Sequence, residues 1–366
     1  MKISIITFHN TSNFGATLQC SALSYYLTRL GHEVKIIDYL PQYVLDKKSV
    51  FKEMKNIGKS HNKIKAMIKG LAYVVYAPAL KRRDNKFEAF IQKNLVLTST
   101  YHSYNSLNDD PPSADFYICG SDQIWNPSLT GGELDYAFFL QFVKENKAAY
   151  GVSMGEFDIE AEGNIVKTLV KDFSGISVRE KSVAKKLSES IGKNVEVVLD
   201  CTLLLKAEEY SCMECDMAVL NKHYVLLYNV QNSKDAIAIS KKIAYDHNLS
   251  IIDISPNPFA KVKGAKKIID IGPGEFLTLI KNAEYVITNS FHGTVFSIIY
   301  ERKFFSLAHS KRAGRVVDLL LSLELIDRLV KSVEEIDDKP IDYIKTKRLL
   351  SVYRQNSFEY INSILP

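Results

Sequence analysis

One histidine stands in a polar stretch of the sequence, Asn289-Ser-Phe-His-Gly293, which separates two apolar runs. The run Tyr285–Thr288 predicts a buried strand, and Thr294–Tyr300 predicts the start of a helix. Backbone N–H groups at a helix start favour anions, and an imidazole exchanges protons near neutral pH. His292 is therefore a candidate acid–base catalyst. Candidate binding residues are Asn289, Ser290 and Gly293. At Gly293 a side chain would crowd a bound group. An ordinary strand–helix connection with a structural histidine is the alternative.

A second polar stretch, Gly120-Ser-Asp122, follows the predicted strand Ala114–Cys119. Loops at the carboxyl ends of parallel strands are the usual ligand sites of open α/β sheets. Asp122 is a candidate general base or only a turn cap, and Gly120 and Ser121 are candidate binding residues. Arg179 lies near the end of a further short strand. Its guanidinium suits a carboxylate or a phosphate, and a structural pairing with nearby acidic residues is the alternative.

Two more segments supply candidate binding residues. The loop that follows the predicted strand Lys2–Phe8 contains Asn13 and Gly15. It lacks the G-x-G-x-x-G spacing, so dinucleotide binding is disfavoured, and a helix cap alone also explains the loop. Arg315 lies in a basic segment after the predicted strand Lys303–Ala308 and is a candidate cation for an anionic ligand. Cations, backbone N–H groups and one imidazole together suit a small phosphorylated acid.

Composition and motif content narrow the class of protein. Of 366 residues, 46% are hydrophobic and 24% are charged, which is typical of a soluble globular protein, and the net charge of +5 is too mild to indicate nucleic acid. The five cysteines are odd in number and three lie in apolar segments, which predicts reduced thiols and a cytoplasmic location. Cys212-Met-Glu-Cys215 has metal spacing but no second pair. The sequence contains no P-loop, nucleophile elbow or zinc pattern, and we expect no cofactor and no metal.

The elements that position these residues alternate between strand and helix, which predicts an α/β fold with parallel sheets. The length suits two domains, and we expect their strand ends to face a shared cleft. Mixed polar residues after residue 206 mark the junction. We therefore predict a first domain of residues 1–206, a second domain of residues 207–340, and a C-terminal helix within residues 341–366 that packs back across both.

Residues 47–93 form a basic insert in the first domain. The segment is rich in lysine and arginine and contains an apolar stretch, Ile64–Leu80, with helical character. A basic amphipathic helix can lie on an anionic bilayer, so peripheral membrane contact is one interpretation. A helical insert packed on the domain with a solvated basic face is the alternative. Nucleic acid is disfavoured because no recognisable binding module surrounds the insert.

Six motifs occur in a fixed order along the chain. They are Asn13-Phe-Gly-Ala-Thr-Leu-Gln19, Gly120-Ser-Asp-Gln-Ile-Trp-Asn-Pro127, Tyr150-Gly-Val-Ser-Met-Gly155, Ile176-Ser-Val-Arg-Glu180, Leu199-Asp-Cys-Thr-Leu-Leu204 and Thr288-Asn-Ser-Phe-His-Gly-Thr-Val-Phe296. Each motif alone is weak, whereas the ordered set is specific and resembles the polysaccharide pyruvyl transferase family. The resemblance runs from the first strand to about Arg328 and leaves out the basic insert and the tail.

The resemblance implies two Rossmann-like domains arranged as in B-type glycosyltransferases. It implies transfer of the enolpyruvate unit of phosphoenolpyruvate onto two hydroxyls of a sugar in a cell-surface polysaccharide precursor. The product is a pyruvate ketal, and phosphate is lost. The implied partners are phosphoenolpyruvate and a sugar or lipid-linked oligosaccharide acceptor, and the insert would then have a membrane role.

By the same resemblance, His292 matches the family's motif histidine and Arg179 matches the arginine of its Ser-Val-Arg-Glu motif; both are expected at the phosphoenolpyruvate site. Family members often carry Arg-Leu-His where Ser290-Phe-His292 stands here. Arg315 or Arg312 is the expected replacement for that arginine. A glycosyltransferase with a nucleotide-sugar donor on the same fold and a non-catalytic assembly protein are the competing interpretations.

Overall fold

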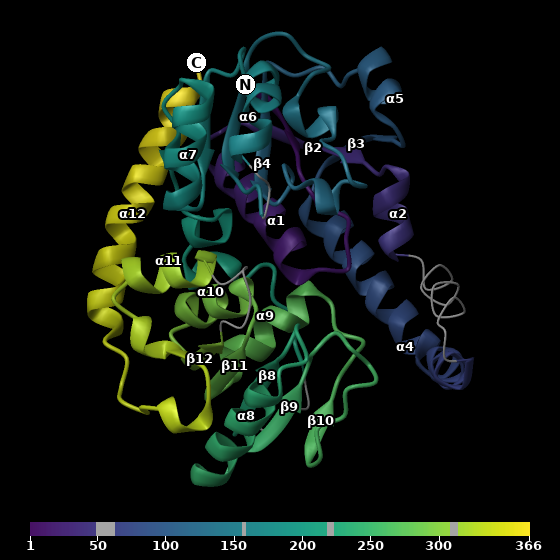
Figure 1. The fold of residues 1–366 in the computed structure, drawn as a ribbon, viewed down its shortest axis with the longest axis vertical. Coiled ribbons are helices and arrows are strands. Elements are labelled where there is room, and N and C mark those ends of the chain that lie inside the picture. The colour runs from purple at the N-terminus through teal and green to yellow at the C-terminus, as the bar shows by residue number, and fades with distance from the viewer. Residues whose placement is uncertain (49–62, 156–158, 218–222, 308–313) are drawn as a thin grey trace. The chain divides into compact units, whose positions relative to one another are not determined.

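The computed structural model describes residues 1–48, 63–155, 159–217, 223–307 and 314–366 (Figure 1). The predicted replacement Arg312 and part of the basic insert lie outside these ranges. The chain divides into two compact units. Unit 1 contains Met1–Leu45, Ile91–Leu205 and Lys347–Pro366, and unit 2 contains Asp46–Phe90 and Lys206–Thr346.

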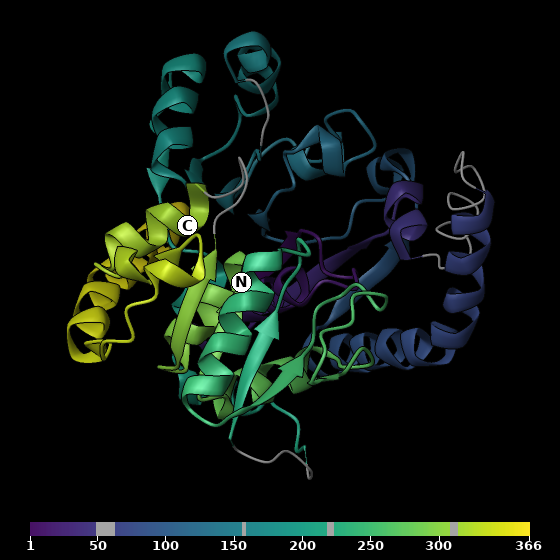
Figure 2. The ribbon, with the colours of Figure 1, turned by 60° about the horizontal axis from the view of Figure 1, so that its bottom comes forward.

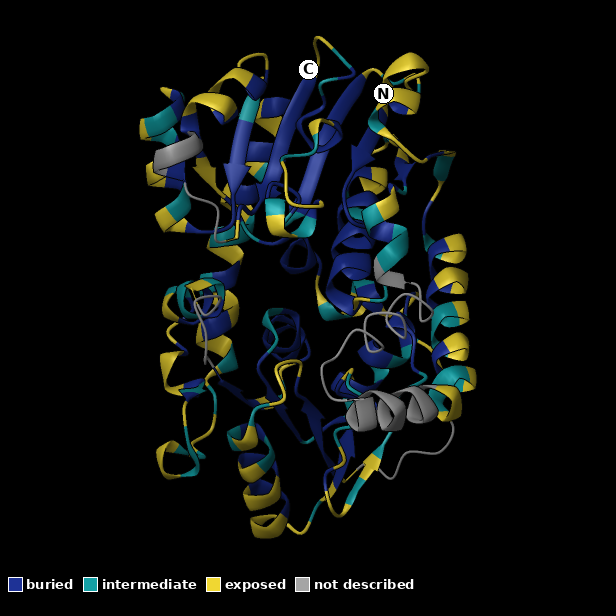
Figure 3. Cartoon of the chain, turned by 45° about the vertical axis from the view of Figure 1, so that its right-hand side comes forward, coloured by how far each residue is buried: buried dark blue, intermediate teal, exposed yellow. Residues whose placement is uncertain are grey.

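Unit 1 is built on a parallel sheet, of which the described residues form seven strands. Their order is β3-β2-β1-β4-β5-β6-β7, and every pairing is parallel. Their bounds are β1 (Lys2–Ile6), β2 (Glu33–Tyr39), β3 (Leu97–Tyr101), β4 (Phe116–Asp122), β5 (Lys147–Val152), β6 (Gly175–Val178) and β7 (Glu196–Val197). The central strands are buried along nearly their whole length (Figure 3), as expected for a parallel sheet covered on both faces.

Helices cover the faces of this sheet. Their bounds are α1 (Phe14–Arg29), α5 (Tyr104–Asp109), α6 (Ile159–Leu169), α7 (Lys181–Ile191) and α12 (Tyr343–Ile364). From residue 347 onward α12 belongs to unit 1, where the Tyr360 hydroxyl donates to the Ala149 carbonyl at 2.7 Å and Phe358 stacks on Tyr26 with ring centroids 4.8 Å apart. The chain passes between the units within α2 (Gln42–Lys48), α4 (Lys63–Asn94) and α12.

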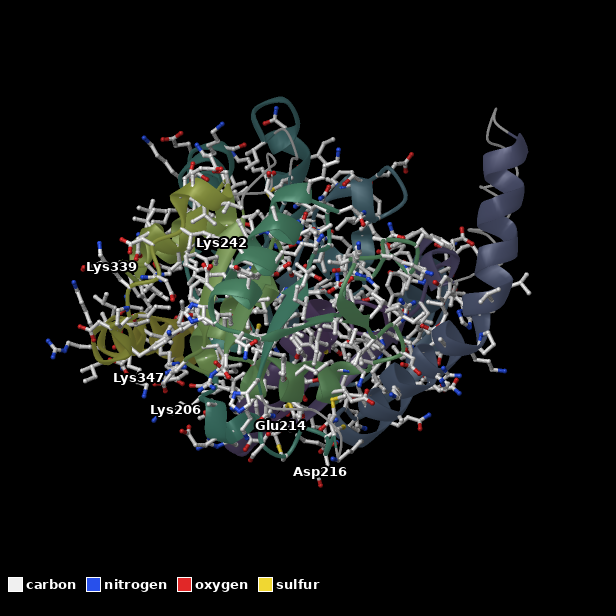
Figure 4. The ribbon with its side chains drawn as sticks, turned by 90° about the horizontal axis from the view of Figure 1, so that it is seen from below. Lys206, Glu214, Asp216, Lys242, Lys339 and Lys347 are labelled. Atoms are coloured by element: carbon white, nitrogen blue, oxygen red, sulfur yellow. The ribbon has the colours of Figure 1, made fainter. Side chains whose placement is uncertain are left out.

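Unit 2 repeats the same plan. Its described strands are ordered β10-β9-β8-β11-β12-β13, again all parallel. Their bounds are β8 (Tyr224–Tyr228), β9 (Ser250–Asp253), β10 (Ala265–Lys267), β11 (Tyr285–Thr288), β12 (Lys303–Leu307) and β13 (Leu329–Val330); the helices are α8 (Lys234–Asp246), α9 (Pro273–Asn282), α10 (Phe291–Ile299) and α11 (Gly314–Ser322). Helix α8 packs along β8, β9 and β11 (Figure 2). Charged side chains such as Lys242 and Lys339 point away from the core (Figure 4).

Both sheets have the strand order of a doubly wound Rossmann-like fold, so the predicted α/β class with two such domains is confirmed. In such sheets the order reverses at one pair of strands, and ligands bind outside their carboxyl ends. This switch point lies between β1 and β4 in unit 1 and between β8 and β11 in unit 2. The predicted stretch 289–293 lies directly after β11, whereas Gly120-Ser-Asp122 forms the last three residues of β4, which extends beyond the predicted strand end at Cys119. The predicted cleft between the domains stays a prediction.

The segment predicted as an insert of the first domain groups instead with unit 2 from residue 46 to residue 90. Three contacts account for this grouping. The Arg82 Nε lies 2.8 Å from Asp270 Oδ2, Lys86 forms an ion pair with Glu275, and Tyr76 contacts the ring of Phe259 edge to face. In the described part of the chain, no helix combines the length and the apolar character needed to cross a membrane.

Candidate functional site

The unit 2 switch point places the polar stretch 289–293 at the end of β11, whose last residue, Thr288, pairs with Tyr228 of β8. Helix α10 begins at Phe291, three residues before the predicted start at Thr294. Ser290 explains the earlier start, because it has extended backbone angles and its hydroxyl accepts from the Gly293 amide at 3.4 Å. His292 therefore lies in the first helical turn, not in the preceding loop.

Asn289 connects β11 to the loop after β8. Its Oδ1 accepts from the Val230 amide at 2.7 Å, and its Nδ2 donates to Asn229 Oδ1 at 2.7 Å. Asn229 in turn accepts from the Ser233 amide at 2.9 Å. These bonds fix the two loops of the switch point to each other, so Asn289 holds the shape of the site.

Gly293 is required for a different reason from the one expected. A Cβ atom built at this position would lie 2.4 Å from Thr288 Oγ1 and 3.0 Å from Thr288 Cβ. The glycine thus lets α10 approach the end of β11 closely, and contact with a bound group is not needed to explain it. A binding role for its backbone amide stays a prediction.

His292 and Arg315 approach the same aromatic ring. The His292 side chain is buried, with 9% of the residue exposed, and its ring centroid lies 5.2 Å from that of Phe291. Arg315, in the first turn of α11, places its guanidinium carbon 5.3 Å from the centroid of Phe291. An imidazole, a guanidinium and the start of a helix thus meet around one residue, an arrangement that can bind an anion and transfer a proton.

Tyr228 lies beneath this turn. Burial raises the pKa of Tyr228 to about 12, and hydrogen bonding to the Ser290 side chain acts in the opposite direction. The phenol is therefore neutral at physiological pH. Ser290, which stands where family members often have arginine, is committed to the helix cap and to this local network.

In unit 1, Asp122 ends β4 with a φ of +75°, a region that residues other than glycine rarely adopt. The strained backbone is held on both sides, because its carbonyl accepts from the Ser153 amide at 2.9 Å and its Oδ1 accepts from the Gln123 amide at 2.8 Å. Strained residues held in this way often occur at functional sites. Asp122 thus serves as a turn cap at the switch point, and its role as a base stays a prediction.

Arg179 is buried among carboxylates. Its Nη1 forms an ion pair with Asp200, and its Nη2 lies 3.8 Å from Asp122 Oδ1. Burial disfavours the charged guanidinium, but Asp200, Glu180 and Asp122 outweigh that effect and raise the pKa of Arg179. The three carboxylates exceed the single positive charge, so this cluster does not attract an anion by net charge.

Asp200 and Glu180, which stand in two of the six motifs, hold the polar side chains around Arg179 in place. Asp200 Oδ1 accepts from the Thr202 amide at 3.0 Å and from its hydroxyl at 2.6 Å, and Ser121 Oγ donates to Asp200 Oδ2 at 3.4 Å. Ser153 Oγ donates to Glu180 Oε1 at 2.7 Å. The structure therefore brings together Ser121, Asp122 and Arg179 in unit 1, which the sequence analysis selected from two separate motifs.

The remaining predicted residues of unit 1 have clear structural tasks. Asn13 caps α1, accepting from the Gly15 amide at 2.9 Å and the Ala16 amide at 3.4 Å. A Cβ at Gly120 would lie 3.1 Å from Ile5 Cγ2, so this glycine allows β4 to pack closely. Roles of Asn13, Gly15 and Gly120 in binding stay predictions.

The sequence did not indicate a buried pair between His9 and Asp38, 29 positions apart. His9 Nε2 lies 2.9 Å from Asp38 Oδ1, and Thr100 donates to the other carboxylate oxygen at 2.5 Å. The only sequence signal was a histidine directly after the first strand. Within the described ranges, no group of three or more His, Cys, Asp or Glu side chains is placed to hold a metal ion.

The family model described as polysaccharide pyruvyl transferase matches residues 13–311, which is most of the chain. The chain belongs to the polysaccharide pyruvyl transferase family. This pyruvyl transferase family member is therefore a transferase enzyme, and the resemblance seen in the six motifs is confirmed. A comparison with curated proteins gave no match.

Solved structures resemble this transferase in fold. A UDP-N-acetylglucosamine 2-epimerase from Rickettsia bellii aligns with a TM-score of 0.50 and 11% identity, over 99% of this chain and 97% of that chain. The UDP-GlcNAc 2-epimerase from Methanocaldococcus jannaschii aligns with a TM-score of 0.49 and 16% identity, over 96% and 92%. At these identities the likeness concerns the fold alone.

Proposed function

We propose that the protein transfers the enolpyruvyl unit of phosphoenolpyruvate to two hydroxyls of a sugar in a cell-surface polysaccharide precursor, forming a cyclic ketal. The observation that carries the proposal is the position of the motif histidine. In a chain that matches the family model over residues 13–311, His292 lies in the first turn of α10 at the switch point of unit 2. That position combines a proton-transfer group with backbone amides that favour an anion.

The reaction needs one proton on carbon and the removal of two from oxygen. Protonation of the methylene carbon of the donor creates an oxocarbenium-like centre, which the first sugar hydroxyl attacks with loss of its proton. The C–O bond to phosphate then breaks, and the second hydroxyl attacks the same carbon and loses its proton. His292 is assigned as the acid–base group, and Asp122 is the second candidate base.

Binding of the donor needs cations, because phosphoenolpyruvate carries a phosphate and a carboxylate. We assign this task in unit 2 to the N-terminal turn of α10 and to Arg315. The guanidinium of Arg315 lies beside Phe291, the neighbour of His292, and so provides positive charge close to the position where family members often have arginine. Arg179 retains its predicted link to the donor as a hypothesis, because its Nη1 is paired with Asp200.

The test is incubation of the purified protein with phosphoenolpyruvate and a panel of free and lipid-linked oligosaccharides. We expect phosphate release in equal amount to ketal formation, and loss of turnover in His292→Ala. If no phosphate is released with any acceptor, the proposal fails. Near-normal turnover in His292→Ala removes the assignment of that residue but not the reaction.

A glycosyltransferase with a nucleotide-sugar donor is the second candidate, because Ser290 provides no guanidinium at the motif. The two are separated by the donor that the protein binds. Stabilisation against heat by phosphoenolpyruvate supports the pyruvyl transferase. Stabilisation by UDP or UDP-sugars alone, with sugar transfer to the same panel, supports the glycosyltransferase.

A further inference from the structure

Unit 1 contains a pocket of about 530 Å³ at its surface, formed by described residues other than the predicted site residues. This volume lies in the range of about 300–1,000 Å³ that is usual for small-ligand sites. Separate segments supply its walls: Tyr39 from the end of β2, Tyr104 from the start of α5, the loop that ends at Tyr136, and Ile165 from α6. Pro127, which ends one of the six motifs, also lines it.

Two tyrosines form an aromatic wall. The rings of Tyr104 and Tyr136 meet edge to face, with centroids 5.9 Å apart and planes inclined by 74°. Tyr136 is 51% exposed and Ile165 is 50% exposed, so two large apolar side chains face water at the same pocket. A tyrosine ring offers an apolar face beside a polar hydroxyl. A sugar ring has the matching chemistry, with C–H groups on its faces and hydroxyls around its edge.

Carboxylates provide the polar part of the pocket. Asp135 Oδ2 accepts from the Tyr39 hydroxyl at 2.8 Å and the Tyr43 hydroxyl at 2.6 Å, and Asp135 Oδ1 accepts from the Ala137 amide at 2.9 Å. Burial and the charge of Asp135 raise the pKa of Tyr39 and Tyr43, so these donors keep their protons and hold the Asp135 carboxylate in place. Glu133 adds an exposed carboxylate.

The charge of the pocket selects against anions. Its described lining contains Glu133 and Asp135 and no lysine, arginine or histidine. A phosphate or a uronic acid would therefore meet like charge, whereas a neutral or amino sugar would not. Phosphoenolpyruvate and nucleotides are therefore disfavoured as ligands of this pocket.

We propose that this pocket binds a neutral or amino sugar of the acceptor glycan. That the bound glycan is the acceptor rests on the proposed function, whereas the binding of a sugar in the pocket does not. The aromatic wall contacts the ring face, and the carboxylates accept from ring hydroxyls or pair with an amine. The loop from Asp122 to Pro127 connects this pocket to the switch point, so the candidate base Asp122 and one residue of the pocket, Pro127, belong to the same motif.

Binding is measured without phosphoenolpyruvate, by calorimetry and by saturation-transfer NMR, with cellobiose, chitobiose, a glucosamine disaccharide and a glucuronic acid disaccharide. We expect the neutral and amino disaccharides to bind and the uronic one to bind at least tenfold more weakly. Tyr136→Ala should lower the affinity by about tenfold, because an aromatic contact and its buried area are lost. Tyr136→Phe should retain most of it.

Tyr245→Ala is the matched control, since Tyr245 is 87% exposed on α8 of unit 2. Binding of none of the disaccharides, or equal loss in Tyr245→Ala and Tyr136→Ala, overturns the proposal. In turnover, Tyr136→Ala should raise KM for the acceptor and leave KM for phosphoenolpyruvate unchanged. If the proposed function fails, sugar binding and its loss in Tyr136→Ala persist although no phosphate is released.

Discussion

Replacement of Arg179 by methionine tests the account of unit 1 most sharply. The side chains of Arg179 and Asp200 are 3% and 0% exposed, so Arg179→Met leaves a buried carboxylate without its cation. Removal of one partner of a buried pair costs about 3–5 kcal/mol. Hydrogen bonds from Thr202 and Ser121 remain on Asp200, which places the expected loss near the lower end of that range. We expect unit 1 to lose about 3 kcal/mol of unfolding free energy.

Trp125 gives a direct signal for this measurement, because it is the only tryptophan of the chain and lies in the core of unit 1. Its ring stacks on Phe139 with centroids 4.6 Å apart, so its fluorescence reports the loss of that packing. Urea unfolding is followed for the wild type, Arg179→Met, Asp200→Asn and the double variant. Asp200→Asn removes the charge and keeps an acceptor for Thr202, so the double variant should recover about 1–2 kcal/mol relative to Arg179→Met.

A loss below about 1 kcal/mol in Arg179→Met, or strict additivity of the two single changes, would refute this reasoning. The same variants separate a structural role from donor binding. If Arg179 binds the donor directly, Arg179→Met raises KM for phosphoenolpyruvate with little loss of stability. If Arg179 instead positions Asp122 and Asp200, the main effect of Arg179→Met is a loss of unfolding free energy.

Three further predictions follow from the structure. Arg315→Met should raise KM for phosphoenolpyruvate by about 10- to 100-fold with a smaller change in kcat, because a charge-assisted hydrogen bond contributes about 1.5–3 kcal/mol. An unchanged KM would remove Arg315 from the donor site. Gly293→Ala should destabilise unit 2 by about 1–3 kcal/mol, because its Cβ would lie 2.4 Å from a threonine oxygen, whereas Gly314→Ala, with nothing within 4 Å, should have little effect on calorimetric stability. Stability should fall as pH rises above 10.0, the ordinary tyrosine pKa, because burial raises the pKa of Tyr39 and Tyr43 and the unfolded chain releases those protons first. The lowered pKa values of Lys147 and Lys267 act in the opposite direction, but burial also raises the pKa values of Tyr224, Tyr300 and Tyr343. Constant stability across that range would contradict the tyrosine shifts.

The sequence was sufficient for the fold class because the pattern of strands and helices is local. β-Branched runs such as Tyr285–Thr288 became buried strands at the predicted positions. The start of α10 was missed because a capping serine begins a helix even where the next residues look like a polar turn. Ser290 itself was the available signal.

The contacts between distant segments could not be predicted from the sequence. Tyr39, Tyr104 and Tyr136 carry no motif, and only the tertiary fold gathers them around one pocket. The grouping of residues 46–90 with unit 2 depends on ion pairs such as Arg82 with Asp270, 188 positions apart. The task of Gly293 likewise depends on packing against β11, whereas the sequence showed only its neighbours.

The central claim is that the donor carbon is protonated and then bonded to two sugar oxygens. The most direct test is the reaction of phosphoenolpyruvate with an accepted oligosaccharide in D₂O, followed by NMR of the product. The account predicts a ketal whose methyl group carries one deuterium, formed in equal amount to phosphate, and no such product with His292→Ala. Phosphate release without a ketal, or a product that retains the CH₂= group of the donor, would contradict it.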